Sequence, residues 1–431
     1  MSDDRTTIVF FPEGAFGPTN NCVGIGNVLK QRGHRVVFIV EESFAGTLEA
    51  RGFEEARMRL QPPPEIEEEP GQCWKGFIRD TAPEFRKPTI EQLESFLRPT
   101  WQALIDGSMY VDDRLREIYD EVRPDVVVED NVVAFAALQT SGSPWVRITS
   151  CNPLELKDPN LPPVFSGYPQ ADRSDWDAFW AAYDRVLGPQ VAAFDEWLRS
   201  RGAPGLPSGR DYIWESPDLN LYVYPREADY DRKEPPGPTW HRLDSSVRSS
   251  DATYTEHERL GSDGKLAYLS LGSLASADVE LMQRLVGVLA RTPHRFIVSK
   301  GPQAELYDLA DNMVGAEFVP QPAILPTVDL VITHGGNNTV TESWYFGKPM
   351  VVLPVFWDQY DNAQRVHELG LGARLPTYAF DDEELRRAIE RLLADDGLNA
   401  RLRTMSATLR ATPGTIRAAD LIEDLARRGR S

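Results

Sequence analysis

The sequence has few cysteines, and those present follow no pattern. The chain of 431 residues contains only Cys22, Cys73 and Cys151. Their spacing matches neither a zinc site nor a disulfide framework, and an odd number suits a reducing compartment. We therefore expect unpaired, buried cysteines and no metal site built from them.

Long apolar runs and an excess of positive charge are also lacking. No run approaches the roughly 18 apolar residues needed to span a bilayer, and the acidic start, MSDDRTT, lacks the basic region of a secretory signal. The 46 basic residues are outnumbered by 66 acidic ones, which disfavours nucleic acid and anionic membranes because neutralising phosphates requires clustered Lys and Arg. We expect a cytoplasmic protein that binds small molecules.

The order of strand and helix patterns indicates an α/β protein. A buried strand at Thr6 to Phe11, a turn-rich loop, a helix ending at Gln31 and a second strand at Val36 to Val40 form the opening unit of a doubly wound sheet. A chain of this length suits two domains. We expect Rossmann-like domains with parallel sheets at 1–235 and 256–410, a Pro-, Gly- and Ser-rich linker at 236–255, and a C-terminal helix at 411–431.

The stretch from Phe318 to Val366 has the strongest local signals. The β-branched run Leu330 to Thr333 predicts a buried strand, and His334 follows at its carboxyl end. Gly335 and Gly336 then permit close approach of a ligand. The residues after them, Asn337, Asn338 and Thr339, can cap a helix whose first N–H groups stay unpaired. This pattern predicts an anion-binding helix terminus.

A second strand in this stretch ends beside further polar residues. Met350 to Leu353 is apolar, and Asp358 and Gln359 lie in the loop that follows. Ligands of open α/β sheets bind outside the carboxyl ends of the strands, so one ligand can touch both loops. We expect a diphosphate at the helix and a polyhydroxyl group beside Asp358 and Gln359.

These residues resemble the UDP-dependent glycosyltransferases of family 1, whose signature contains H-x-G-x-N-[ST]-x-x-E and a later D-Q. The resemblance implies that His334, Asn338 and Thr339 hold the diphosphate, Glu342 the ribose, and Asp358 with Gln359 the hexose. Phe318 stands where the family usually has a Trp that stacks on the base. The matching positions are His334, Gly336, Asn338, Thr339, Glu342, Asp358 and Gln359.

The same resemblance extends to both halves of the chain. The spellings RGHRVVFIV and YLSLGS are typical of the family, and in the second of them Gly272 and Ser273 offer backbone N–H groups to the diphosphate. The family fold is GT-B, with a C-terminal helix that crosses back to the first domain. The remaining candidates for the sugar-nucleotide site are Gln321, Asn337 and Trp357. The resemblance implies inverting transfer of a hexose from a UDP-sugar co-substrate, with glucose as the hexose because of Gln359. It implies neither a cofactor nor a metal.

The first loop departs from the family pattern. Bacterial members commonly read G-H-x-N-P there, with histidine as the base, whereas this chain reads Gly17-Pro18-Thr19-Asn20-Asn21. Pro18 occupies the histidine position, and shifting the alignment by two residues places Phe16 there. Phe16, Pro18 and Asn20 remain the candidates for the acceptor loop. Asp130, after the strand Val126 to Val128, matches the usual carboxylate partner of the base.

Three interpretations follow from the missing histidine. Asp130, or Glu13 in the first loop, acts as the base with a pKa raised by burial. Alternatively, the acceptor is a phenol or carboxylate acidic enough to react without a strong base. Finally, the chain binds a UDP-sugar without transferring it, or instead epimerises or hydrolyses it. The complete signature, including Asp358 and Gln359, favours an active transferase.

The sequence says less about the acceptor than about the sugar nucleotide. Pro-rich and aromatic segments of the first half suggest a sizeable, partly apolar acceptor such as a natural product. The aromatic residues either line the acceptor pocket or pack helices together; they are Trp74, Phe77, Phe85, Phe96 and Trp101.

Overall fold

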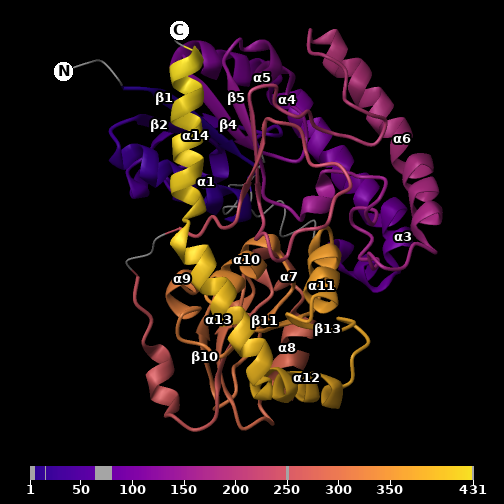
Figure 1. The fold of residues 1–431 in the computed structure, drawn as a ribbon, viewed down its shortest axis with the longest axis vertical. Coiled ribbons are helices and arrows are strands. Elements are labelled where there is room, and N and C mark those ends of the chain that lie inside the picture. Colours follow the sequence, from indigo (N-terminus) through magenta and orange to yellow (C-terminus); the bar gives the residue numbers. More distant parts are fainter. Residues whose placement is uncertain (1–4, 15, 64–79, 249–251, 430–431) are drawn as a thin grey trace.

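The computed structural model describes residues 5–14, 16–63, 80–248 and 252–429, which form two α/β domains (Figure 1). Within these ranges, the first domain contains seven parallel strands in the order β3-β2-β1-β4-β5-β6-β7. Apolar, β-branched runs fill its central strands, which is typical of a parallel sheet covered on both faces. The strands are β1 (Thr7–Pro12), β2 (Arg35–Glu41), β3 (Glu54–Met58), β4 (Val126–Asp130), β5 (Trp145–Thr149), β6 (Leu219–Val223) and β7 (Trp240–Leu243).

Long helices flank this sheet. A short π-helical turn, Leu93–Leu97, joins α3 to α4, so the chain is helical from Thr89 to Val122. Pro189 lies inside α6 without ending it. The α-helices of this domain are α1 (Phe16–Gln31), α3 (Thr89–Gln92), α4 (Arg98–Val122), α5 (Ala136–Thr140) and α6 (Trp176–Ser200).

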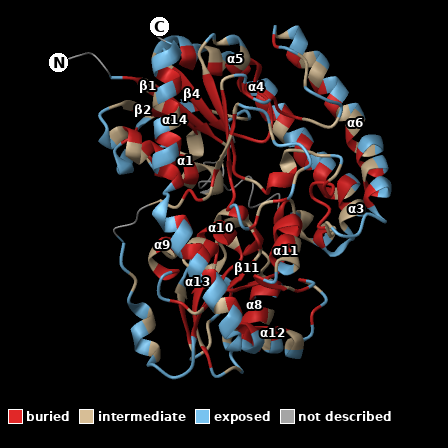
Figure 2. Ribbon diagram, in the orientation of Figure 1, coloured by how far each residue is buried: buried red, intermediate tan, exposed pale blue. Residues whose placement is uncertain are grey.

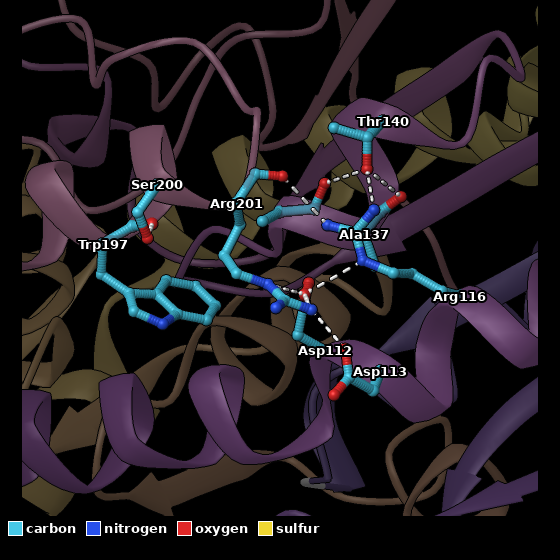
Figure 3. Close-up of polar contacts among 9 residues, drawn as sticks. Asp112, Asp113, Arg116, Ala137, Thr140, Trp197, Ser200 and Arg201 are labelled. Atoms are coloured by element: carbon cyan, nitrogen blue, oxygen red, sulfur yellow. Dashed lines mark hydrogen bonds and ion pairs between the residues drawn. The ribbon is translucent and has the colours of Figure 1, made fainter.

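A charged cluster connects α4, α5 and the end of α6. Figure 3 shows the carboxylate of Asp112, which is 2% exposed, between Arg116 and Arg201. The Oδ2 atom of Asp112 accepts from Nε of Arg201 at 2.7 Å and from Nε of Arg116 at 3.1 Å. Arg116 also donates to Thr140 Oγ1 at 2.7 Å. The cluster therefore fixes three helices to one another.

The second domain contains six parallel strands among the described residues, in the order β10-β9-β8-β11-β12-β13. Its strands are β8 (Leu266–Ser270), β9 (Arg295–Ser299), β10 (Met313–Ala316), β11 (Leu330–Thr333), β12 (Met350–Val352) and β13 (Gly372–Arg374). Its α-helices are α7 (Gly272–Ala275), α8 (Val279–Leu289), α9 (Gln321–Ile324), α10 (Asn337–Tyr345), α11 (Gln359–Glu368), α12 (Asp382–Ala394) and α13 (Asp396–Ala411). The α/β fold with two parallel sheets is confirmed.

The last helix, α14 (Gly414–Gly429), returns from the second domain to the first, as its yellow ribbon shows in Figure 1. Its apolar face, including Ile422, packs in the core beside α1. On its polar face, Glu423 pairs with Arg32 at 2.9 Å and with His34 at 2.8 Å. His34 thus lies in an interhelical contact, away from the carboxyl ends of the strands.

The segment expected to be a linker, 236–255, contains a strand. Residues Trp240 to Leu243 form β7, which pairs in parallel with β6 and closes the edge of the first sheet. Pro and Gly before it suggested an unstructured connection, but Trp240 and Leu243 are buried. The first domain therefore extends past residue 235, and that expected boundary was wrong.

Buried residues form two clusters, which Figure 2 shows in red along the sheets. One cluster fills the space between the first sheet, α1 and α14. The other covers the opposite face of that sheet and continues into the second domain. Cys22 and Cys151 are unpaired, whereas Cys73 lies outside the described residues. Within the part of the chain that the structure describes, no helix is both long and apolar enough to cross a membrane.

Candidate active site

Both sheets place candidate residues where the strand order reverses. In the first sheet this switch point lies between β1 and β4, and in the second between β8 and β11. Glu13 follows β1 and its N–H donates to the carbonyl of Asp130, the last residue of β4, at 2.9 Å. Gly272 follows β8 and His334 follows β11. Ligands of such sheets bind at switch points, so the two pairs mark opposite sides of one cleft.

His334 is enclosed by two glycines. A Cβ atom on Gly272 would lie 2.7 Å from Cε1 of His334, and one on Gly336 would lie 2.6 Å from Nε2. Gly272 also has a φ of 72°, which disfavours other residues. Burial lowers the pKa of His334 to about 4, while a hydrogen bond with the Ser270 backbone opposes that shift. The imidazole is therefore neutral and can donate one N–H.

The amino terminus of α10 differs from the expected cap. Gly336 is the N-cap, and the expected capping residues Asn337 and Asn338 lie in the first turn. Their side chains instead reach the first domain. Asn337 Nδ2 donates to the carbonyls of Ser150 at 2.8 Å and Val223 at 3.1 Å, and Asn338 Nδ2 donates to that of Gly17 at 2.8 Å.

Glu342 lies one turn further along α10 and is 3% exposed. Its Oε1 accepts from Arg248 Nη1 at 3.0 Å, and its Oε2 accepts from Gln321 Nε2 at 2.6 Å. Gln321, the first residue of α9, also contacts Thr339 Oγ1 at 3.5 Å. Phe318 precedes this helix, and its side chain is 47% exposed. The structure therefore brings three predicted sugar-nucleotide residues together, Gln321, Thr339 and Glu342.

Asp358 and Gln359 lie at the start of α11. Asp358 Oδ2 accepts from the backbone N–H of Asn152 at 2.8 Å. Gln359 Oε1 accepts from the backbone N–H groups of Val355 and Phe356, at 3.0 and 3.1 Å. The loop after β12 is thus rigid. Burial raises the pKa of Asp358 to about 7, the Asn152 hydrogen bond lowers it, and the nearby Glu155 charge adds to the rise.

Glu13 faces this loop from the first domain. Burial raises its pKa to about 7, and the charges of Glu155 and Asp358 contribute to the increase. The residue is partly exposed. Three carboxyl groups from two domains therefore gather at one place, and a group with a pKa near neutrality can accept a proton there.

Asp130 is more enclosed than Glu13, with 3% of its surface exposed. Burial raises its pKa to about 8, the hydrogen bond from Ser150 opposes that rise, and Glu13 adds to it. The Ser150 hydroxyl donates to Asp130 Oδ2. Asn21 Nδ2 donates to Ser150 Oγ and also to Asn338 Oδ1, both at 2.8 Å. A hydrogen-bonded chain thus runs from Asp130 to the second domain.

The expected acceptor loop is helical. Phe16 is the first residue of α1, and Pro18 and Asn20 lie in its first two turns. Proline is tolerated at the third helical position because its N–H would have no partner within the helix. The turn-rich loop expected after the first strand is therefore shorter than predicted, because α1 begins at Phe16.

Aromatic residues of both domains line a cavity next to the carboxyl groups. Trp101 stacks on Tyr212 with ring centroids 3.9 Å apart, and Trp357 lies 5.0 Å from Trp101 and 4.6 Å from Phe165. Glu155 also lines this cavity. Trp357, expected at the sugar-nucleotide site, therefore faces the first domain with a φ of 58°.

Of the other aromatic candidates for the acceptor pocket, two pack against neighbouring rings and two lie outside the described residues. Phe85 and Phe96 pack on each other and on Phe356, at 4.9, 5.3 and 5.6 Å between centroids. Trp74 and Phe77 lie outside the described residues.

Several residues of the cleft were missed in the sequence. Ser150 and Asn152 follow β5, so the same rule about carboxyl ends of strands would have found them. Asn21 adjoins the predicted Asn20. Arg248 lies in an irregular segment between the domains, where no local sequence pattern indicated a functional residue.

The structure has two facing parallel sheets, and candidate ligand-binding residues lie at the switch point of each. This arrangement defines the GT-B class of glycosyltransferase. Residues 283–425 match the family described as Erythromycin biosynthesis protein CIII-like, C-terminal domain. The oleandomycin glycosyltransferase of Streptomyces antibioticus is 27% identical over 427 residues, which cover 96% of this chain and 90% of the relative.

Solved structures agree with this fold. The glycotransferase of kitacinnamycin has a TM-score of 0.70 and 24% identity, covering 98% of this chain and 99% of its own. A spinosyn rhamnosyltransferase complexed with thymidine diphosphate has a TM-score of 0.60 and 20% identity, covering 97% and 99%. The chain is a glycosyltransferase with the GT-B fold, similar in sequence and structure to these proteins.

Proposed function

We propose that the chain transfers a hexose from a UDP-sugar to a hydroxyl group of a small, partly apolar natural product, with inversion and without a metal ion. The name of the oleandomycin relative supports an antibiotic-like acceptor. The aromatic walls formed by Trp101, Phe165 and Trp357 also suit an apolar acceptor. Gln359 favours glucose as the hexose by resemblance to the family.

The position of Glu13 carries this proposal. Glu13 is a partly exposed residue at a switch point; burial raises its pKa, and Glu155 and Asp358 are close enough for their charges to add to that rise. By resemblance, Asp358 holds the hexose. A base beside Asp358 is therefore beside the acceptor hydroxyl that attacks the sugar. This placement offers a substitute for the histidine that Pro18 replaces.

The chemistry then follows from the two sides of the cleft. The Glu13 carboxylate takes the proton of the acceptor hydroxyl, and the acceptor oxygen forms a bond to the anomeric carbon. The bond between that carbon and the diphosphate oxygen breaks, and the released charge is stabilised by the N–H groups of α10 and the neutral His334. Attack opposite the diphosphate inverts the anomeric centre.

Asp130 is assigned a supporting role in this proposal. Its Oδ2 is occupied by the Ser150 hydroxyl, and it is less exposed than Glu13. We therefore expect Asp130 to orient Ser150 and Asn21 rather than to contact the acceptor.

Transfer assays with two matched carboxamide variants test the proposal. UDP-glucose and dTDP-glucose are incubated with phenols and aliphatic alcohols, with Glu13→Gln and Asp130→Asn beside the unaltered chain. We expect a β-glycoside from the α-configured sugar nucleotide, unchanged by EDTA, and a loss of at least about 100-fold in kcat for Glu13→Gln, the usual range for a general base. Equal turnover in Glu13→Gln and the unaltered chain would exclude Glu13 as the base.

Pro18 in place of the histidine supports one other candidate function, binding of a sugar nucleotide without transfer. In that case UDP-glucose binds but no glycoside forms with any acceptor. Release of glucose and UDP without an acceptor would instead identify a hydrolase.

A further inference from the structure

The buried carboxylate of Glu342 is held by a residue that belongs to neither sheet. Arg248 Nη1 lies 3.0 Å from Oε1 of Glu342, whose side chain is 5% exposed. Gln321 holds the other oxygen at 2.6 Å. An ionised carboxylate has about four acceptor positions. Two therefore remain for hydroxyl groups of a ligand, one on each oxygen.

Arg248 contacts both domains. It lies between β7 and β8, and its Cα and Cβ atoms lie against α1, where a Cβ added to Gly24 would be 3.6 Å from each. Its guanidinium group reaches α10 of the second domain. Arg51 is the other cation nearby, since the charge of Arg248 contributes to lowering the Arg51 pKa. Arg248 therefore joins Glu342 to the interdomain segment.

The ion pair also controls the charge of Glu342. Burial raises the pKa of Glu342, and the charge and hydrogen bond of Arg248 oppose that increase. Without Arg248, the pKa of Glu342 would be raised further. A protonated carboxyl group donates one hydrogen bond itself and is a poorer partner for two hydroxyl groups.

We propose that Arg248 is a positioning residue for the nucleotide ribose, orienting the Glu342 carboxylate so that it accepts hydrogen bonds from the 2′ and 3′ hydroxyl groups. This inference rests on the proposed function, in which the ribose of a UDP-sugar lies at Glu342. Because Arg248 also lies against α1, the ribose contact links sugar-nucleotide binding to the segment between the domains.

Calorimetric titration of the full chain with UDP, 2′-deoxy-UDP and 3′-deoxy-UDP tests the role. We expect the unaltered chain to prefer UDP over each deoxy analogue by about tenfold, the effect of one hydrogen bond to a charged group. Arg248→Gln should lose most of this preference while still binding the deoxy analogues. Arg248→Lys keeps the charge and should retain part of the preference.

Arg51→Gln is the matched control for local positive charge. It should weaken the binding of all three nucleotides, because it removes a positive charge near Arg248. The loss should be the same factor for each nucleotide, because Arg51 does not hold Glu342. Thermal unfolding of each variant shows whether the fold is retained.

Two outcomes would overturn the inference alone: an unchanged preference in Arg248→Gln, or an equal loss for all three nucleotides, which would place Arg248 at the diphosphate or in the fold. If the unaltered chain does not bind UDP, the proposed UDP-sugar function fails and the inference fails with it. Turnover is not required for any of these readouts.

Discussion

Asn21 and Asn338 join their side chains across the two domains, with Asn21 Nδ2 donating to Asn338 Oδ1 at 2.8 Å although the residues are 317 positions apart. Asn338 Nδ2 donates in turn to the Gly17 carbonyl at 2.8 Å. The amide that is expected to hold the diphosphate is therefore engaged by the first domain. A sugar nucleotide that uses this amide must replace these hydrogen bonds.

Replacing Asn21 with alanine should make UDP bind more tightly. The bond to Oδ1 helps to hold the Asn338 amide with its Nδ2 on the Gly17 carbonyl, so its removal makes it easier for Nδ2 to turn toward a diphosphate. A hydrogen bond contributes about 1 kcal/mol net, or roughly fivefold in affinity. Calorimetric titration with UDP measures the change. Asn20→Ala is the neighbouring control and should bind UDP like the unaltered chain. Weaker binding in Asn21→Ala alone would show that the contact also stabilises the bound state.

A methyl group at Gly336 should weaken UDP binding by displacing His334. The φ of Gly336 is −58°, so alanine introduces no backbone strain. Its Cβ would lie 2.6 Å from His334 Nε2, which forces the ring to move. We expect Gly336→Ala to lose about tenfold in UDP affinity, because a hydrogen bond to a charged group is lost. His334→Ala should do the same.

The control for this experiment is Gly287→Ala, in the last turn of α8. No atom lies within 4 Å of the added Cβ there, and alanine favours a helix over glycine by about 1 kcal/mol. UDP affinity should be unchanged and the chain slightly more stable. If Gly336→Ala binds UDP normally while His334→Ala does not, the ring tolerates displacement and the two glycines have another role.

The rate of transfer should rise with pH. Burial raises the pKa of Glu13 to about 7, so the carboxyl group is protonated and inactive as a base below that pH. It becomes ionised above it, and kcat should therefore rise to a plateau with a midpoint near 7. Measurement of kcat from pH 5 to 9 with a non-ionising alcohol acceptor gives the profile. A midpoint near 8 that disappears in Asp130→Asn would identify Asp130 instead, because its pKa is raised to about 8.

Much of the fold and half of the site could be predicted from local sequence. Buried runs such as Leu330 to Thr333 have few alternatives to a central parallel strand, and the polar residues after them had to meet at one edge. In the structure, Glu342 and Thr339 of α10 lie within hydrogen-bond distance of Gln321. The individual roles of these residues stay predictions.

The remaining features depend on contacts between distant segments. Pro18 suggested a loop, but its position in the first turn of α1 is compatible with a helix. β7 is a short strand, and its few apolar residues indicate a strand only once β6 is known to lie beside them. Arg248 pairs with Glu342 only because the fold brings α10 beside the interdomain segment. None of these features can be predicted from the periodicity of apolar residues in the sequence.

The cluster in Figure 3 predicts a large loss of stability in one variant of the first domain. Asp112→Asn should lower the free energy of unfolding by about 2 kcal/mol, because it weakens charge-assisted hydrogen bonds to Arg116 and Arg201 that are each partly exposed to water. Chemical denaturation with urea, monitored by circular dichroism, measures the difference.

Glu383→Gln provides the matched comparison, since Glu383 pairs with Arg386 at 2.6 Å on the surface of α12 and its side chain is 56% exposed. Exposed pairs contribute about 0.5 kcal/mol, so this variant should unfold almost like the unaltered chain. The difference between the two variants depends on burial, because both replace a carboxylate that pairs with arginine. Equal midpoints would mean that the desolvation of Asp112 offsets its attraction to the two arginines, and that the cluster orients α4, α5 and α6 without stabilising them.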